Sequence, residues 1–272
     1  MQLRTRIAAG AALATVAVMA GVFILPSSDR RDVGARQTSP SSATKPIAAD
    51  PTVVDAGRNA RMDAFFASLE RQPPTASLYL AMKTEFPQRY AEMKDTLRKE
   101  MEGSHSFQPS SERMIALTRE SLDGVQDLIR QSSDESLRKV AAAQYALLSI
   151  LSVRNPAVCA RYAAEGGYAD MPQDAAVLEA VTGLSTVQVH AAGDAARSPR
   201  KRKPPTPAVF MQLVQKMRTD GITDQQIYLL GDGKLGTLPP EEQCRVAMSM
   251  YRSTLTMPAV DAGTLLAAII KT

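Results

Sequence analysis

Tryptophan is absent from this chain of 272 residues, and aromatic residues make up only 5% of it. Stacked bases and sugars need aromatic surfaces, so the sequence offers no such platform. Histidine is almost as scarce, because His105 and His190 are the only two, and neither stands at a ligand spacing to the cysteines. There is also no Gly-x-Ser-x-Gly and no Cys-x-x-Cys sequence. Motifs for a serine hydrolase, a dithiol oxidoreductase or a zinc enzyme are therefore missing, and no metal or cofactor is expected.

Uncharged apolar runs long enough to cross a bilayer are missing too, with one exception at 7–25, directly after Arg4 and Arg6. As a helix, its nineteen residues would span roughly 28 Å, close to the hydrocarbon thickness of a bilayer. The run therefore predicts a transmembrane anchor. The alternative is a cleaved signal peptide with its cut after Ala20, although 21–25 stays apolar where a polar region is expected.

Small residues recur along one face of this apolar run. They are Gly10, Ala14, Ala17 and Gly21, at spacings of 4, 3 and 4. Such a stripe lets two membrane helices approach closely, and it predicts a homodimer face. The competing interpretation is chance placement in an Ala-rich segment.

Composition divides the rest of the chain. Ser, Pro, Thr and Ala dominate the stretch after the apolar run, which predicts a disordered tether that cannot bury enough surface to order itself. The expected layout is a short basic tail at 1–6, the membrane segment at 7–25, the tether at 26–55, an N-terminal helical lobe at 56–196, a basic Pro-rich linker at 197–207 and a C-terminal helical lobe at 208–272.

Basic residues flank the membrane segment on both sides, so its orientation depends on the general plan of anchor, tether and folded domain. This plan favours an inner-membrane protein whose domain lies on the periplasmic side. Secretion to the periplasm after signal cleavage is the alternative.

Helical periodicity runs through the folded part and predicts an all-α, irregular domain of about nine to eleven short helices. Apolar side chains at i, i+3, i+4 and i+7 indicate a helix over 58–71, and another buried stripe joins 115 to 129 as one helix. The segment 140–153 is apolar nearly all round, which is typical of a central helix covered on every side. Asn155-Pro156 after it predicts the start of another helix, with a cap followed by proline at the first helical position. Within an otherwise helical 174–196, the residues 186–189 alternate as in a short strand.

Two cysteines in an exported domain predict one disulfide, Cys159–Cys244. It would close a loop of about 86 residues and stabilise the fold by on the order of 4.5 kcal/mol on the loop-entropy argument. Two unpaired, buried thiols are the alternative.

The densest charge in the chain lies between prolines, which disfavour a helix and predict an exposed loop. Its five cations are Arg197, Arg200, Lys201, Arg202 and Lys203. The favoured interpretation is a solvated linker between lobes, and the alternative is that these cations are the contact for anionic lipid or an envelope polymer. Nucleic acid is not favoured, because a net charge of +4 is modest.

The stretch 231–236 matches Gly-x-Gly-x-x-Gly but follows a helical pattern and precedes two prolines. A dinucleotide site needs a strand before those glycines. We therefore expect a helix end and a tight turn there, with no cofactor.

These features favour a membrane-anchored, exported α-helical binding or scaffold domain without a catalytic site of its own. It would bind a protein partner in the assembly or regulation of an envelope complex. An exported hydrolase of an envelope polymer is an alternative, because two carboxylates can converge in space rather than in sequence. A cytoplasm-facing nucleic-acid-binding protein that uses 197–203 is another.

Overall fold

The computed structural model describes residues 51–101, 109–122, 124–165, 171–172 and 174–270. The predicted membrane segment, its dimer face, most of the tether and His105 lie outside these residues. Within them the regular structure is entirely helical, so the all-α prediction is confirmed for this part of the chain. The elements are α1 (Pro51–Leu69), α2 (Ala76–Glu85), α3 (Pro87–Glu100), α4 (Ser111–Ser121), α5 (Val125–Ile129), α6 (Asp134–Arg154), α7 (Pro156–Glu165), α8 (Ala175–Arg197), α9 (Pro207–Thr219), α10 (Asp224–Gly231), the 3₁₀ helix η2 (Leu235–Thr237), α11 (Pro240–Leu255) and α12 (Ala259–Ile269).

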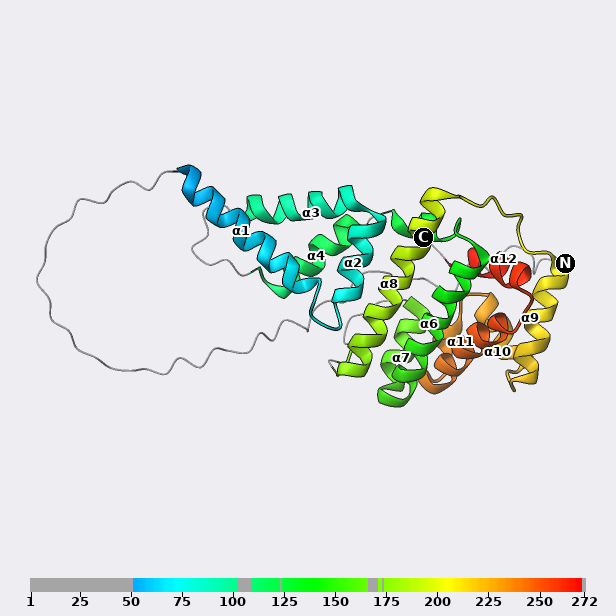
Figure 1. The fold of residues 1–272 in the computed structure, drawn as a ribbon. Helices are drawn as coiled ribbons and strands as arrows, with labels where there is room; N and C mark the ends of the chain where they lie inside the picture. Colours follow the sequence, from blue (N-terminus) through cyan, green and yellow to red (C-terminus); the bar gives the residue numbers. More distant parts are fainter. Residues whose placement is uncertain (1–50, 102–108, 123, 166–170, 173, 271–272) are drawn as a thin grey trace, which may run out of the picture.

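Helices far apart along the chain lie side by side, because α8 lies between α2 and α6 (Figure 1). Helices α1, α3 and α4 lie at one end, and α2 connects them to α8. Helix α8 packs on α6, and α6 packs in turn on α7, α11 and α12. Helices α9 and α10 cover α11 at the other end. One cluster of buried side chains includes members from α1 to the end of α12, so the segments predicted as two lobes contribute to the same core.

Helix α6 contains the segment expected at the centre of the fold. Leu137, Leu147 and Leu151 are fully buried, and the helix contacts four others. Coverage is incomplete on one side, because Ala142 and Val153 are exposed. The prediction of a central helix is confirmed, but full burial was wrong. Ala142 and Val153 lie on a stripe of α6 that no neighbouring helix in the described part of the chain covers.

Local sequence accounts for several helix starts. Ser133 and Asp174 accept hydrogen bonds from backbone N–H groups in the first turns of α6 and α8. Asn155 does the same for Val158 at the start of α7, as the Asn-Pro pair predicted. Thr223 and Gln226 form a capping box on α10. These side chains satisfy N–H groups that have no partner inside the helix.

Three boundaries differ from the sequence prediction. Helix α1 begins at Pro51, so 51–55 is helical rather than part of the tether. The stripe from 115 to 129 belongs to two helices, because Gly124 adopts a left-handed φ of 74° before α5. The residues 186–189 lie inside α8, where α2, α5 and α6 cover it from several sides and remove the polar face expected of an isolated helix.

Among the helices that the structure describes, none is both long and apolar enough to cross a bilayer.

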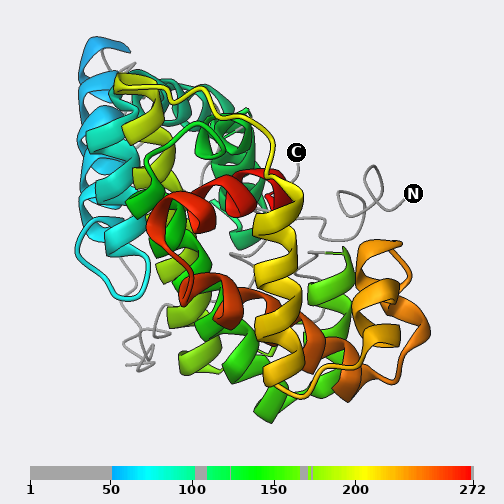
Figure 2. The same cartoon turned by 90° about the vertical axis from the view of Figure 1, so that its right-hand side faces the viewer.

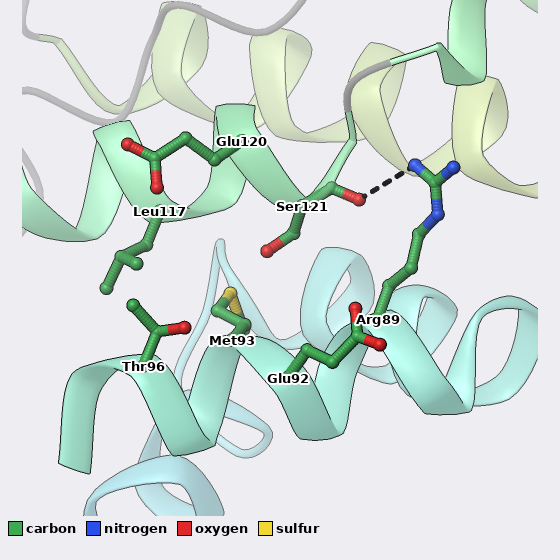
Figure 3. A pocket seen from close by; sticks show the side chains of 7 residues that line it. All are labelled: Arg89, Glu92, Met93, Thr96, Leu117, Glu120 and Ser121. Atoms are coloured by element: carbon green, nitrogen blue, oxygen red, sulfur yellow. Dashed lines mark hydrogen bonds between the residues drawn. The ribbon is translucent and has the colours of Figure 1, made fainter. Parts of the chain in front are cut away.

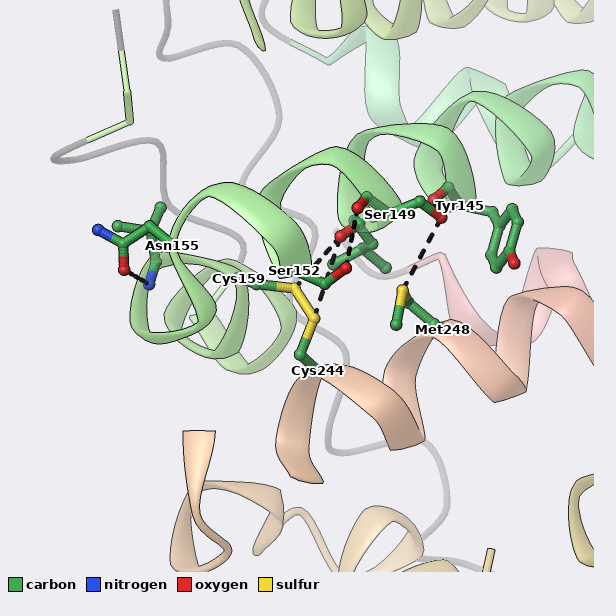
Figure 4. Close-up of a disulfide and its surroundings, with 9 residues drawn as sticks. Tyr145, Ser149, Ser152, Asn155, Cys159, Cys244 and Met248 are labelled. Carbon is green, nitrogen blue, oxygen red and sulfur yellow. Dashed lines mark hydrogen bonds between the residues drawn. A yellow bond between two sulfur atoms is a disulfide. The ribbon is translucent and has the colours of Figure 1, made fainter. Parts of the chain in front are cut away.

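Cys159 and Cys244 form a disulfide, with their Cα atoms 5.6 Å apart. The bond joins α7 to the first turns of α11 beside α6 (Figure 4). Both residues are at most 1% exposed, and the Cys159 sulfur lies 3.5 Å from the Leu148 carbonyl oxygen of α6. The disulfide therefore lies within the core, where three helices meet.

Replacing both cysteines, Cys159→Ala and Cys244→Ala, should lower the free energy of unfolding of the oxidised protein. The expected loss is on the order of 4 kcal/mol, because the bond restricts a long loop in the unfolded chain. Urea unfolding of both proteins, with and without reductant, measures it. Reductant should lower the free energy of unfolding of the original protein and leave that of the double variant unchanged. If reductant did not change the free energy of unfolding of the original protein, the prediction would be contradicted.

Candidate functional site

The connection 198–206 between α8 and α9, here called the strap, contains most of the predicted basic run. It has no regular structure and crosses the top of the molecule in Figure 2. Pro199, Pro204 and Pro205 account for this, because proline lacks an N–H and disfavours helix in the residue before it. The exposed loop expected from the prolines is thus present at this position.

Arg202 attaches the strap to the turn between α5 and α6. Its guanidinium donates to the Arg130 carbonyl oxygen at 2.9 Å, to the Ser132 carbonyl oxygen, and to Asp134 Oδ1 at 2.8 Å. Only 12% of the Arg202 side chain is exposed. A cation at the end of α5 also faces the negative end of the helix dipole. Arg202 therefore stabilises the fold rather than facing solvent.

A glycine in α12 makes room for this ion pair. A Cβ at Gly263 would lie 2.1 Å from Asp134 Oδ1 and 2.9 Å from its Cβ. Any larger residue would push α12 away from the start of α6. The absence of a side chain at Gly263 thus lets the Asp134 carboxylate lie between the two helices.

Arg197, at the end of α8, forms an ion pair with Glu85 at the end of α2. His190 Nδ1 lies 2.9 Å from the other oxygen of the same carboxylate. Glu85 is 8% exposed and packs over Gly193, where a Cβ would lie 2.0 Å from Oε2. Burial alone would raise the pKa of Glu85, but the contacts with His190 and Arg197 outweigh it, so the pKa lies below its usual value.

Asp194 joins α8 to the start of α6. Its Oδ2 accepts hydrogen bonds from the Ser133 backbone N–H and from the Ser136 hydroxyl, both at 2.8 Å. Burial would raise the pKa of Asp194, but these hydrogen bonds and the nearby charge of Arg197 lower it below its usual value. Glu85 and Asp134 thus pair with Arg197 and Arg202, and Asp194 connects α8 to the start of α6.

The five predicted cations therefore fall into two groups. Arg197 and Arg202 pair with carboxylates of the same chain. The side chains of Arg200, Lys201 and Lys203 are exposed, and no carboxylate in the described part of the chain pairs with them. The Arg200 backbone N–H donates to the Gln131 carbonyl oxygen at 2.7 Å, which adds a second attachment. The candidate anionic contact is reduced to three residues on a fastened loop.

Sequence reasoning did not identify Glu85 and Asp134 as partners of the basic run, or Asp194 as the acceptor for Ser133 and Ser136. They lie 58 to 112 positions away from the residues they bind. No spacing rule connects such positions, and only the packing of α2, α6 and α8 brings them together.

Two shallow polar grooves flank α3. The groove against α4 has a cavity volume of about 390 Å³, and Glu92, Glu120 and Ser121 line it together with Arg89, Met93, Thr96 and Leu117 (Figure 3). Arg89 donates to the Ser121 carbonyl oxygen at 3.2 Å across it. The groove against α1, of about 370 Å³, is lined by residues that include Asp63, Lys94 and Arg98. Among the described residues, neither lining contains histidine or cysteine.

The glycine-rich stretch 231–236 adopts the turn expected for it. Helix α10 ends at Gly231, Gly233 has a φ of 70°, and η2 follows. A helix rather than a strand precedes the glycines, so the geometry of a dinucleotide site is not present there. Across the described residues, no group of three or more His, Cys, Asp or Glu side chains could hold a metal ion.

Comparison with known proteins gives no relative. No protein family, curated protein or solved structure matches this chain.

Arg202→Gln should lower the free energy of unfolding by about 2 kcal/mol, because it leaves the Arg130 and Ser132 carbonyls and the Asp134 carboxylate without their donor. The neighbouring Lys203→Gln is the matched control and should change stability by no more than about 0.5 kcal/mol. Urea unfolding at neutral pH compares them. Equal effects of the two substitutions would contradict the attachment described here.

Asp194→Asn should destabilise the fold by about 1 kcal/mol at neutral pH, because it weakens two hydrogen bonds to a charged acceptor. Since folding lowers the pKa of Asp194, its stabilising effect is present above the ordinary value of 3.8 and is lost as pH falls through the folded-state value. The melting temperatures of the two proteins should therefore converge as the pH falls below about 4.

Thermal unfolding across a pH series measures this convergence. Asp95→Asn, an exposed carboxylate on α3, serves as the control and should change the melting temperature little at any pH. A constant difference between Asp194→Asn and the original protein at every pH would contradict the assignment.

Proposed function

We propose that this chain is a membrane-anchored, exported α-helical domain that binds another macromolecule in the assembly or regulation of an envelope complex. The Cys159–Cys244 disulfide in the core is the observation that carries the proposal. Disulfides persist in oxidising compartments and are rare in the cytosol. With the apolar run at 7–25, it supports a domain held outside the cytoplasm by an N-terminal anchor.

The surface of the described helices supports binding rather than catalysis. The two grooves beside α3 are shallow and polar, and the described residues that line them include none of the histidine or cysteine that general-base and nucleophilic catalysis most often use. A binding role needs only complementary shape and charge. The strap and the exposed faces of the helices provide these.

Apolar contacts contribute little to such binding in the described part. The large exposed apolar side chains lie on five different helices: Leu80, Val153, Met211, Tyr228 and Val260. Scattered apolar residues are normal on soluble domains and do not define an interface. The charged strap is therefore the most distinctive surface of the described domain.

The thiol state in cells tests this proposal. Acid quenching, alkylation and a gel shift with and without reductant should show both thiols blocked in a monomer. Fractionation should leave the chain in the membrane after a high-salt wash, because an apolar helix and not charge retains it. The expected mature protein keeps residues 1–20.

Other outcomes would overturn parts of the proposal. Two free thiols in cells would remove the support for export and favour the cytoplasm-facing alternative. A mature N-terminus at Gly21, with the protein in the soluble periplasmic fraction, would replace the anchor with a cleaved signal peptide.

A further inference from the structure

We propose that the strap binds the phosphate groups of anionic lipids and docks the domain onto the membrane that holds its anchor. The contact residues are Arg200, Lys201 and Lys203. This inference rests on the proposed function, because it needs the anchor at 7–25.

Charge pairing beneath and beside the strap leaves these three cations without compensation in the described structure. Glu85 and Asp134 pair with Arg197 and Arg202, and Asp194 accepts from two serines. Asp127 on α5 and Glu135 on α6 are also engaged, by Arg130 and Lys139 respectively. The exposed face of the strap therefore carries a local excess of three positive charges.

The strap presents this charge in an ordered form. Arg202 holds it through hydrogen bonds to the α5–α6 turn, and the Arg200 N–H binds the Gln131 carbonyl oxygen. A loop already fastened at two points loses less conformational entropy on binding than a flexible one. Exposed Lys201 and Lys203 alternate with the inward-facing Arg202, so attachment and contact use different residues of the same segment.

The start of the domain lies on the same side as the strap. Figures 1 and 2 differ by a turn about the vertical axis, and in both the start of α1 and the strap lie in the upper part, although toward opposite ends of the molecule in Figure 1. The proposed tether enters at α1, and 26–50 would span roughly 28 Å as a coil. A membrane at the end of this tether can face the strap without any rearrangement of the helices.

Because the domain is tethered to the membrane, three cations are enough to dock the strap onto the lipid surface. Each Lys or Arg near an anionic surface strengthens association roughly fivefold, so three give on the order of a hundredfold. Three such residues bind weakly in free solution, but the anchor makes the contact intramolecular and raises its effective concentration. The contact should weaken with salt, because the interacting charges are exposed.

The absence of tryptophan from the chain allows a direct test. Ser198 is exposed and is the first residue of the strap, directly after α8. Ser198→Trp therefore places one reporter in the strap of the full-length protein reconstituted into vesicles. Val153→Trp is the matched control, because it lies near the opposite end of α6, roughly 28 Å from Asp134 along the helix. Brominated lipid quenches tryptophan only where the indole reaches the bilayer.

Two lipid compositions distinguish binding to anionic lipid from mere closeness of the tethered domain to the bilayer. In vesicles containing about one-third phosphatidylglycerol, we expect quenching of the Ser198→Trp reporter that high salt reverses. In phosphatidylcholine alone we expect little quenching, and the Val153→Trp reporter should stay unquenched in both. Quenching that is absent, or equal in the two compositions, would overturn the inference.

Charge substitutions identify the contact residues. Arg200→Gln, Lys201→Gln and Lys203→Gln together, in the Ser198→Trp background, should abolish quenching while the melting temperature stays unchanged. The control with the same charge change, made at the far ends of α6 and α9, is Arg154→Gln, Lys216→Gln and Arg218→Gln. It should quench as the parent does, and equal loss in both variants would show a net-charge effect and contradict a site at the strap.

Two further experiments test the anchor and the source of the phosphate groups separately. Flotation with phosphatidylcholine vesicles in high salt reports the anchor alone: a chain that does not float contradicts the proposed function, whereas a floating chain without quenching contradicts only the docking. Soluble polyphosphate, with inorganic phosphate as control, tests the other source of phosphate groups. A Ser198→Trp response to polyphosphate without a response to anionic vesicles would overturn the lipid assignment.

Discussion

Burial of α6 is the constraint on which the described fold depends. The helix has 21 residues, and its apolar side chains point to more than one side. Because no single neighbour can cover such a helix, α7, α8, α11 and α12 each pack against a different part of it. The two cysteines come together in this arrangement, since α7 and α11 meet beside α6.

The polar contacts near the start of α6 follow from the same packing. Helix α8 crosses α6 closely enough for Asp194 to accept hydrogen bonds from Ser133 and Ser136. Two glycines, Gly193 and Gly263, leave room for the carboxylates of Glu85 and Asp134 between helices. Arg197 and Arg202 then neutralise these carboxylates, because an unpaired charge in such a place is costly. Arg197 and Arg202 of the basic run are thus part of the structural framework.

The basic run thus contains both paired and exposed cations, and this connects the fold with the proposed function. The buried part of the basic run holds the strap, and the exposed part stays available for a partner. The grooves beside α3 are a second exposed feature, and two carboxylates, Glu92 and Glu120, line the groove against α4. A charged, fastened strap and a disulfide-linked core fit a domain that is positioned at a surface and binds there.

Much of the local structure could be read from the sequence. Helical periodicity predicted the all-α class, Asn155-Pro156 predicted a helix start, and prolines predicted an exposed connection near 200. Periodicity could not show that Gly124 separates two helices, because an apolar stripe continues across the break in the same register. It also could not separate strand-like alternation from a helix buried on several sides, as at 186–189 in α8.

The sequence by itself determined the helical class, the apolar run, the two cysteines and the concentration of charge at 197–203. Only the tertiary structure decided which of those charges face inward. Arg202 and Lys203 are neighbours of the same sign, yet one binds Asp134 and two carbonyls while the other is exposed. The physical reason is that an ion pair depends on distance in space, and the packing of α2, α6, α8 and α12 sets the positions of the carboxylates.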